Sequence, residues 1–133
     1  MSKTKLKMSQ QIDEILEALR TFGLPIFEDE IAEDEQEQFK EDGHNFFIYT
    51  TGDMSKNDDK KSILQDVAVI YYSENKENLD EQTVDIIEAL KDVGLLTFNG
   101  AQKERLRRKD TDGFVDRIIF LYQRKIILPG CII

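Results

Sequence analysis

The sequence holds little of what most catalytic and metal-binding sites are built from. It contains one histidine, one cysteine and no tryptophan among its 133 residues. One cysteine excludes an intramolecular disulfide, and such sparing use is typical of proteins from a reducing compartment. Glycine-rich phosphate loops, CxxC pairs and the HExxH and GxSxG patterns are all missing from the sequence. These gaps argue against the common catalytic and redox classes.

Long apolar runs are also missing. No stretch approaches the roughly 18 apolar residues that a membrane-spanning helix needs. The lysines near the start are not followed by an apolar run of signal-peptide length. We therefore expect a soluble chain without a membrane anchor or membrane partner.

Positive charge is scarcer than negative charge. The chain has 18 lysines and arginines against 27 aspartates and glutamates, which gives a net charge of −9 and a pI near 4.6. General binding to a nucleic-acid backbone requires cations that replace phosphate counterions, so this balance argues against it. The same balance is compatible with solubility and with a surface that must not hold DNA.

A helix-then-strand pattern occurs twice. The segment IDEILEALRTFGLPIF at 12–27 and the segment TVDIIEALKDVGLLTF at 83–98 align at a constant offset of 71 residues, which relates Glu17 to Glu88 and Gly23 to Gly94. Apolar residues at helical spacing are followed in both by glycine and a short apolar run. We therefore expect two similar units of helix followed by strand.

In the first half, the pattern predicts a helix over about 10–22 that ends at Gly23. Pro25 cannot donate a ladder hydrogen bond, so the short segment around it is expected to be an edge strand or the start of a strand. The aromatic and β-branched run at 44–52 predicts a strand, and the polar run at 53–61 predicts a flexible hairpin connection. The run at 62–73 predicts a long strand that lies either in the centre of the sheet or at a subunit contact.

In the second half, Asp80 is a candidate cap for a helix that continues to Gly94. A strand from Leu95 follows, with a tight turn or a bulge at Asn99–Gly100, and the final strand is expected at 114–128. The predicted fold class is α+β, in the order α-β-β-β-α-β-β, with two helices on one face of an antiparallel or mixed sheet. We expect one domain over residues 1–133, with flexible ends at 1–8 and 129–133. Several strands are apolar on both sides, which indicates a partner for the open sheet face.

Two charged segments are candidate interaction sites. The acidic run at 28–42 lacks the glycine and the alternating ligands of a calcium loop, so it is either a solvated loop or an electronegative wall. The basic cluster at 103–109 suits a head-to-tail contact with the acidic run of a neighbouring copy; simple exposed charge and nucleic-acid contact are its alternatives. The acidic candidates are Glu28, Asp29, Glu30, Glu33, Asp34 and Glu35, and the basic candidates are Lys103, Arg105, Arg107, Arg108 and Lys109.

Residues suited to catalysis do not converge in the sequence. His44 stands alone at the start of a strand, and Cys131 has no basic neighbour that would lower the pKa of its thiol. We expect no enzyme activity, no cofactor and no metal ion.

The stretches FGLPIF, HNFFIYTTGD, DVAVIYYSE, TVDIIEALKDVGLLTF and DGFVDRIIFLYQRKI together resemble the small tail-completion proteins of long-tailed bacteriophages, the tail terminators and tail-to-head joining proteins. The resemblance covers about residues 9–128, and the chain length and acidic balance agree with it. It rests on element order and patterning, and it carries over no catalytic residue.

The resemblance implies a structural role in the virion. Such proteins form a hexameric ring on the last ring of the tail tube, stop tube growth and offer a surface to the head connector. The expected partners are the tail tube protein, the head connector or head-completion protein and further copies of the chain, while DNA passes without specific binding. The chain would be made in the host cytoplasm and end at the head–tail junction of the virion. The alternatives are a head-closure or connector component and a small soluble bacterial binding module.

Overall fold

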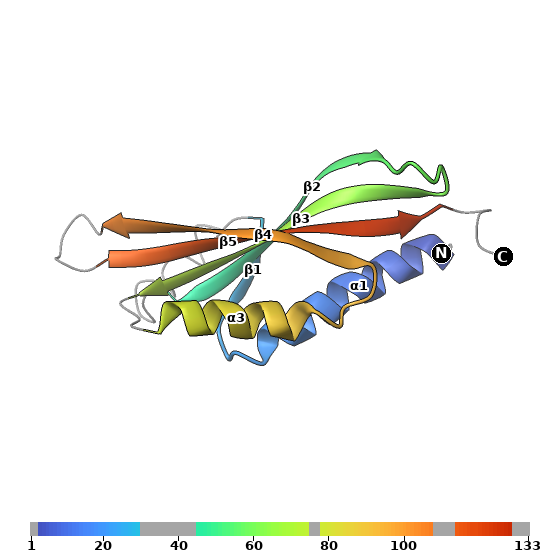
Figure 1. Cartoon of the computed structure of the whole chain (residues 1–133). Helices are drawn as coiled ribbons and strands as arrows, with labels where there is room; N and C mark the ends of the chain where they lie inside the picture. Colours follow the sequence, from blue (N-terminus) through green and yellow to red (C-terminus); the bar gives the residue numbers. More distant parts are fainter. Residues whose placement is uncertain (1–2, 30–44, 75–77, 108–113, 129–133) are drawn as a thin grey trace.

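Two helices cover one side of a five-stranded sheet, and no described helix lies on the other side, which we call the open face (Figure 1). A computed structural model of the chain describes residues 3–29, 45–74, 78–107 and 114–128. The elements follow the order α1 (Lys3–Arg20), β1 (Ile26–Glu28), β2 (Phe46–Lys56), β3 (Ser62–Glu74), α3 (Leu79–Leu90), β4 (Leu96–Arg107) and β5 (Phe114–Ile127). This is the predicted α+β order.

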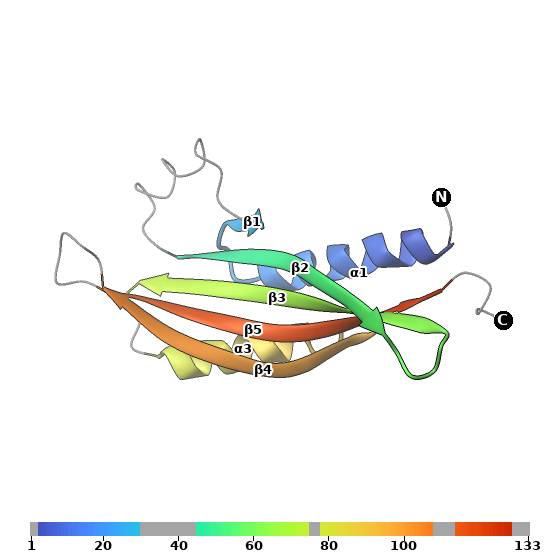
Figure 2. The same cartoon turned by 90° about the horizontal axis from the view of Figure 1, so that it is seen from above.

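The sheet is mixed, with spatial order β1-β2-β3-β5-β4. Three long antiparallel pairings make up most of it, and β1 adds a short parallel pairing to β2 at one edge, where Ile26 lies beside Phe47. The edge position of β1 confirms the expectation drawn from Pro25, whose carbonyl accepts a hydrogen bond of 2.9 Å from the Phe47 amide. Figure 2 shows how β2, β3, β5 and β4 run side by side along the molecule.

The main core lies between the helices and the sheet. Ile15 and Leu19 of α1 and Ile86 and Leu90 of α3 project onto it, because each pair recurs at the helical spacing of four residues. Alternate residues of the sheet meet them: Phe47, Val67, Val69, Tyr71, Ile118, Phe120 and Tyr122. Most of the two apolar stripes that predicted the helices faces this shared core. Val84, which the pattern placed in the buried stripe of the second helix, is instead 62% exposed.

Helix α1 begins earlier than the sequence pattern predicted. Residues 3–8 are helical, and Thr4 is buried, with its hydroxyl donating a 2.9 Å hydrogen bond to the carbonyl of Ile127. This contact with the end of β5 orders a segment that lacks a regular apolar stripe. The expectation of a flexible segment at 1–8 is therefore wrong for residues 3–8, and the expected flexible end at 129–133 lies outside the described residues.

The connection between β2 and β3 is shorter and more ordered than expected. Residues 53–56 belong to β2, because the ladder resumes at Met54 opposite Gln65 after an irregularity beyond Thr51.

The cap residue predicted for the second helix, Asp80, was wrong. Asn78 occupies the cap position of α3 without a side-chain hydrogen bond, and Asp80 lies in the first turn, where its charge still suits the helix dipole.

The two helix-then-strand units end at opposite edges of the sheet. Strand β1 follows α1 at one edge, and β4 follows α3 at the other. The units differ in direction, because β1 is parallel to its neighbour β2 whereas β4 is antiparallel to its neighbour β5.

Of the tight turn or bulge predicted at Asn99–Gly100, the bulge is present, as a register shift between Phe98 and Gly100.

Candidate interaction surfaces

The open face of the sheet, the side turned away from α1 and α3, carries an apolar centre. Ile70 of β3 lies between Ile48 of β2 and Ile119 of β5, and Ala68 lies beside Leu121. Leu121 is 37% exposed, and Ile70 and Ile119 are half-buried. Apolar side chains that gather on an open sheet are a typical protein-binding surface.

At one end of this open face, packed aromatic side chains and an ion pair border the apolar centre. The rings of Phe46 and Tyr72 stack with centroids 4.4 Å apart, and Phe27 packs edge-on against Phe46 at 5.8 Å. Beside them the Arg117 guanidinium donates from Nε to Glu104 Oε2 at 3.1 Å. The hydrogen bond to Glu104 is the main cause that raises the pKa of Arg117. The apolar centre therefore has a rigid border at this end.

A hollow of about 300 Å³ borders the apolar centre on its other side, and its surface is mainly apolar. Thr50, Gly52 and Asp66 line it from β2 and β3, and Asn99 and Leu121 line it from β4 and β5. The hollow extends the apolar centre toward the polar side chains of Thr50, Asp66 and Asn99.

Two basic candidates of β4, Lys103 and Arg105, already have side-chain partners within the chain. Lys103 Nζ lies 2.8 Å from Asp80 Oδ1 of α3, and Arg105 Nε donates to Asp116 Oδ1 at 2.9 Å. The hydrogen bond to Asp116 is the main cause that raises the pKa of Arg105. For Arg107 the structure gives the backbone pairing with Phe114. The remaining candidates, Arg108 and Lys109, lie outside the described residues.

The acidic candidates are described only where the run begins. Glu28 ends β1, and Asp29 has a left-handed backbone with φ of 64°. The Asp29 amide donates to the Tyr49 carbonyl at 2.8 Å, and its carboxylate accepts a 2.9 Å bond from the Thr50 hydroxyl. These two hydrogen bonds therefore hold Asp29, near the start of the acidic run, against β2 at the sheet edge. Glu30, Glu33, Asp34 and Glu35 lie outside the described residues, as does His44.

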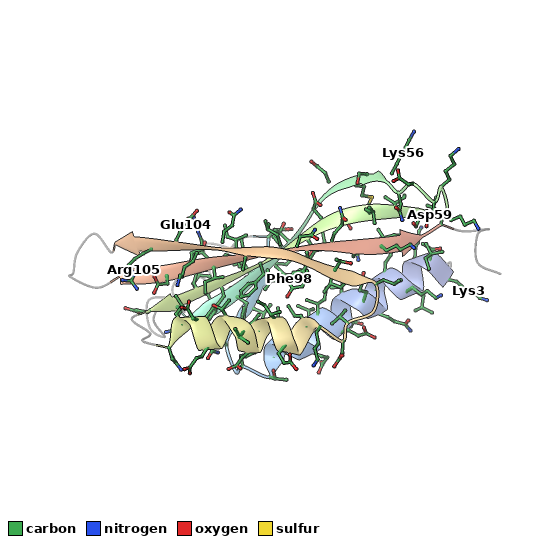
Figure 3. All side chains as sticks on the ribbon, viewed as in Figure 1. Lys3, Lys56, Asp59, Phe98, Glu104 and Arg105 are labelled. Carbon is green, nitrogen blue, oxygen red and sulfur yellow. The ribbon has the colours of Figure 1, made fainter. Side chains whose placement is uncertain are left out.

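Sequence reasoning missed a second basic surface, which we call the lysine end. The start of α1, the turn between β2 and β3 and the end of β5 meet at one end of the molecule (Figure 1), where the Leu128 amide donates to the Lys61 carbonyl at 2.9 Å. Figure 3 labels Lys3, Lys56 and Asp59 there, and Glu104 and Arg105 at the opposite end. Three segments far apart in sequence thus supply the lysine end: Lys3, Lys5, Lys7, Lys56, Lys60, Lys61 and Lys125.

Asp59 orders the turn within the lysine end. Its Oδ1 accepts hydrogen bonds from the Lys61 amide at 2.9 Å and the Ser62 amide at 3.1 Å, and its Oδ2 lies 3.4 Å from Lys125 Nζ. The bond from the Lys61 amide is the main cause that lowers the pKa of Asp59. The turn is therefore preformed, in contrast to the flexible connection expected from its polar sequence.

A hollow of about 490 Å³ lies beside this turn and is largely apolar. Met54, Ile63 and Leu128 give it an apolar floor, and Lys56 and Lys60 stand at its rim. Met54 is 53% exposed. The lysine end therefore combines charge with an accessible apolar contact.

Buried polar groups also lie beneath the helices. Arg124 is 5% exposed and donates from Nε to Gln65 Oε1 at 2.8 Å, and Gln65 in turn donates to the Gly52 carbonyl at 3.1 Å. Burial lowers the pKa of Arg124 and raises the pKa of Tyr122 to about 12. This network ties β5 to β3 and β2 and lies in the protein interior, so its role is structural.

Within the described residues, no three histidine, cysteine, aspartate or glutamate side chains gather closely enough to hold a metal ion. No helix in the described part of the chain is long and apolar enough to cross a membrane.

No protein-family model matches the sequence, and no curated protein matches it significantly.

Proposed function

We propose that this chain is a structural assembly protein that closes the end of a bacteriophage tail tube as a ring and joins the tail to the head connector. The sequence resemblance provides the hypothesis, and the α+β order of the fold agrees with it. The one observation that supports it most is the open sheet face with its apolar centre of Ile70, Ile119 and Leu121, which lies beside the buried cluster of Phe27, Phe46 and Ile48. A sheet covered on one side gains free energy when a protein covers the other side.

The proposed mechanism is geometric. The open face of each copy docks on the last ring of tube protein and covers the surface on which the next ring would add. The preformed borders of the face favour tight docking, because few side chains must be ordered on binding. Further copies complete a ring, which in the family that the sequence resembles has six members.

Immunoelectron microscopy of particles from a phage that encodes this chain tests the proposal. An antibody against the chain is expected to label the head–tail junction of complete particles. Label retained on headless tails supports the terminator role, whereas label that stays with tailless heads would assign the chain to head closure. Particles that carry no label at either place would refute a structural role in the virion.

A further inference from the structure

An acidic face on α3 complements the lysine end. Glu81, Asp85 and Glu88 are exposed at spacings of four and three residues, so they lie on one side of the helix. Carboxylates at these spacings repel one another in an isolated helix, and the exposed ion pair of Glu88 with Lys91 offsets only part of this repulsion. A cationic partner surface would relieve that repulsion. An anionic partner surface would likewise stabilise the clustered positive charges of the lysine end.

Each of these two charged surfaces has an apolar residue at its centre. Val84 lies one turn from both Glu81 and Glu88 and is 62% exposed. At the lysine end, the hollow beside Met54 and Ile63 has an apolar floor with Lys56 at the rim. An apolar centre within a charged rim is the usual anatomy of a protein–protein interface.

The two surfaces lie on different parts of the molecule. The lysine end is at the hairpin and the start of α1, whereas α3 lies beneath the opposite half of the sheet (Figures 1 and 3). A contact between different surfaces of two copies is heterologous, so it repeats from copy to copy and closes into a ring when the rotation permits.

We propose that the lysine end of one copy docks on the acidic face of α3 in a second copy, with Val84 seated in the hollow beside Met54. This contact joins neighbouring copies in the ring proposed above, and its biological role rests on that proposal. It differs from the pairing expected from the sequence, in which Lys103, Arg105 and their neighbours met the acidic run. Lys103 and Arg105 already have intrachain partners.

A second copy fits the lysine end better than a nucleic acid does. The net charge of −9 repels a polyanion at long range. Backbone phosphates would also leave the apolar floor at Met54 and Ile63 without a matching contact, because that binding is electrostatic. Val84 of a second copy fills this position, and every copy carries both surfaces.

Two charge-reversal variants test the contact. The lysine-end variant carries Lys56→Glu and Lys60→Asp; aspartate suits position 60 because its backbone is left-handed, with φ of 59°. The acidic-face variant carries Asp85→Lys and Glu88→Lys. Its matched control is Asp13→Lys with Glu17→Lys on α1, because Glu17 pairs with Arg20 as Glu88 pairs with Lys91.

Sedimentation velocity at low salt measures the self-association of each variant. Each reversal variant is expected to weaken self-association about tenfold or more, since attractive charge pairs become repulsive ones, while the control variant matches the native chain. An equimolar mixture of the two reversal variants is expected to regain association, because each restores the complement of the other. Recovery on mixing cannot come from misfolded protein.

Three results would overturn the contact: a native chain that stays monomeric at all concentrations, a control variant that weakens association equally, or a mixture that fails to recover. Fluorescence anisotropy with a labelled DNA duplex tests the competing partner. Salt-sensitive DNA binding that the lysine-end variant loses, with self-association unchanged, would reassign the lysine end to nucleic acid. Junction labelling without self-association would refute the contact and leave the proposed virion role standing.

Discussion

The guanidinium of Arg105, on the edge strand β4, donates hydrogen bonds to the buried carboxylate of Asp116. Arg105 Nε is 2.9 Å from Asp116 Oδ1, and Nη2 is 3.4 Å from Oδ2. Asp116 is 1% exposed, whereas the Arg105 side chain is largely exposed. A buried carboxylate without its cation is strongly unfavourable. Arg105 therefore contributes to folding, and its replacement is a poor test of docking.

This relationship predicts an asymmetric effect on stability. Arg105→Ala should lower the Tm clearly, because it leaves the Asp116 charge buried without its guanidinium. Lys103→Ala, which removes an exposed ion pair with Asp80, should change the Tm little. Adding Asp116→Asn to Arg105→Ala should recover part of the loss, as measured by thermal unfolding. Equal Tm values for the two alanine variants would contradict the assignment.

The bulge in β4 predicts a difference between two glycines. Gly100 has φ of 148° and Gly94 has no such restriction, and an added Cβ would meet no atom within 4 Å at either position. Gly100→Ala should therefore cost about 1–3 kcal/mol of backbone strain, whereas Gly94→Ala should be neutral or stabilise by up to about 1 kcal/mol. Chemical denaturation measures both changes. A Gly100→Ala variant as stable as Gly94→Ala would show that the bulge tolerates a side chain.

The elements themselves were predictable because they depend on local pattern. The alternation of Val67, Val69 and Tyr71 with their neighbours defined β3. The apolar spacing of Val84, Ile87, Leu90 and Val93 defined α3, although Val84 is exposed. Pro25 limited the following strand to an edge strand or a strand start. Both hold, because β1 begins directly after Pro25 and lies at the sheet edge.

The interaction surfaces were less predictable because they depend on distant segments. The lysine end combines α1, a turn and β5, and its assembly requires contacts such as that of Thr4 with Ile127, 123 residues away. The partners of Lys103 and Arg105 follow from the placement of α3 and the register of β4 on β5. The order of the turn depends on one carboxylate, that of Asp59. The sequence pattern did not single out Asp59, because its neighbours are polar as well.

Asp59 predicts a local dependence on pH. Its folded pKa lies below the ordinary value of 3.8, mainly because the carboxylate accepts the Lys61 amide. A lowered pKa means that this stabilisation is fully present above about pH 4 and is lost as the pH falls through the folded value. The Lys61 and Ser62 amides should therefore exchange faster in strong acid. In Asp59→Asn their exchange should be faster at neutral pH and lack this acid step. Identical acid profiles in the native chain and the Asp59→Asn variant would exclude Asp59 as the titrating group.

Leu121 predicts how the open face takes part in docking. Leu121→Lys places a charge in the apolar centre, which should weaken binding to assembled tail tubes by about tenfold or more, because the charge would be desolvated at the interface. The free energy of unfolding should change by about 1 kcal/mol or less, since Leu121 is 37% exposed. Gln123→Lys, two residues along the same strand and face, is the matched control. Co-sedimentation with tubes of the cognate tube protein measures the bound fraction. If both lysine variants bind as the native chain does, the tube docks elsewhere, and the apolar centre serves another contact.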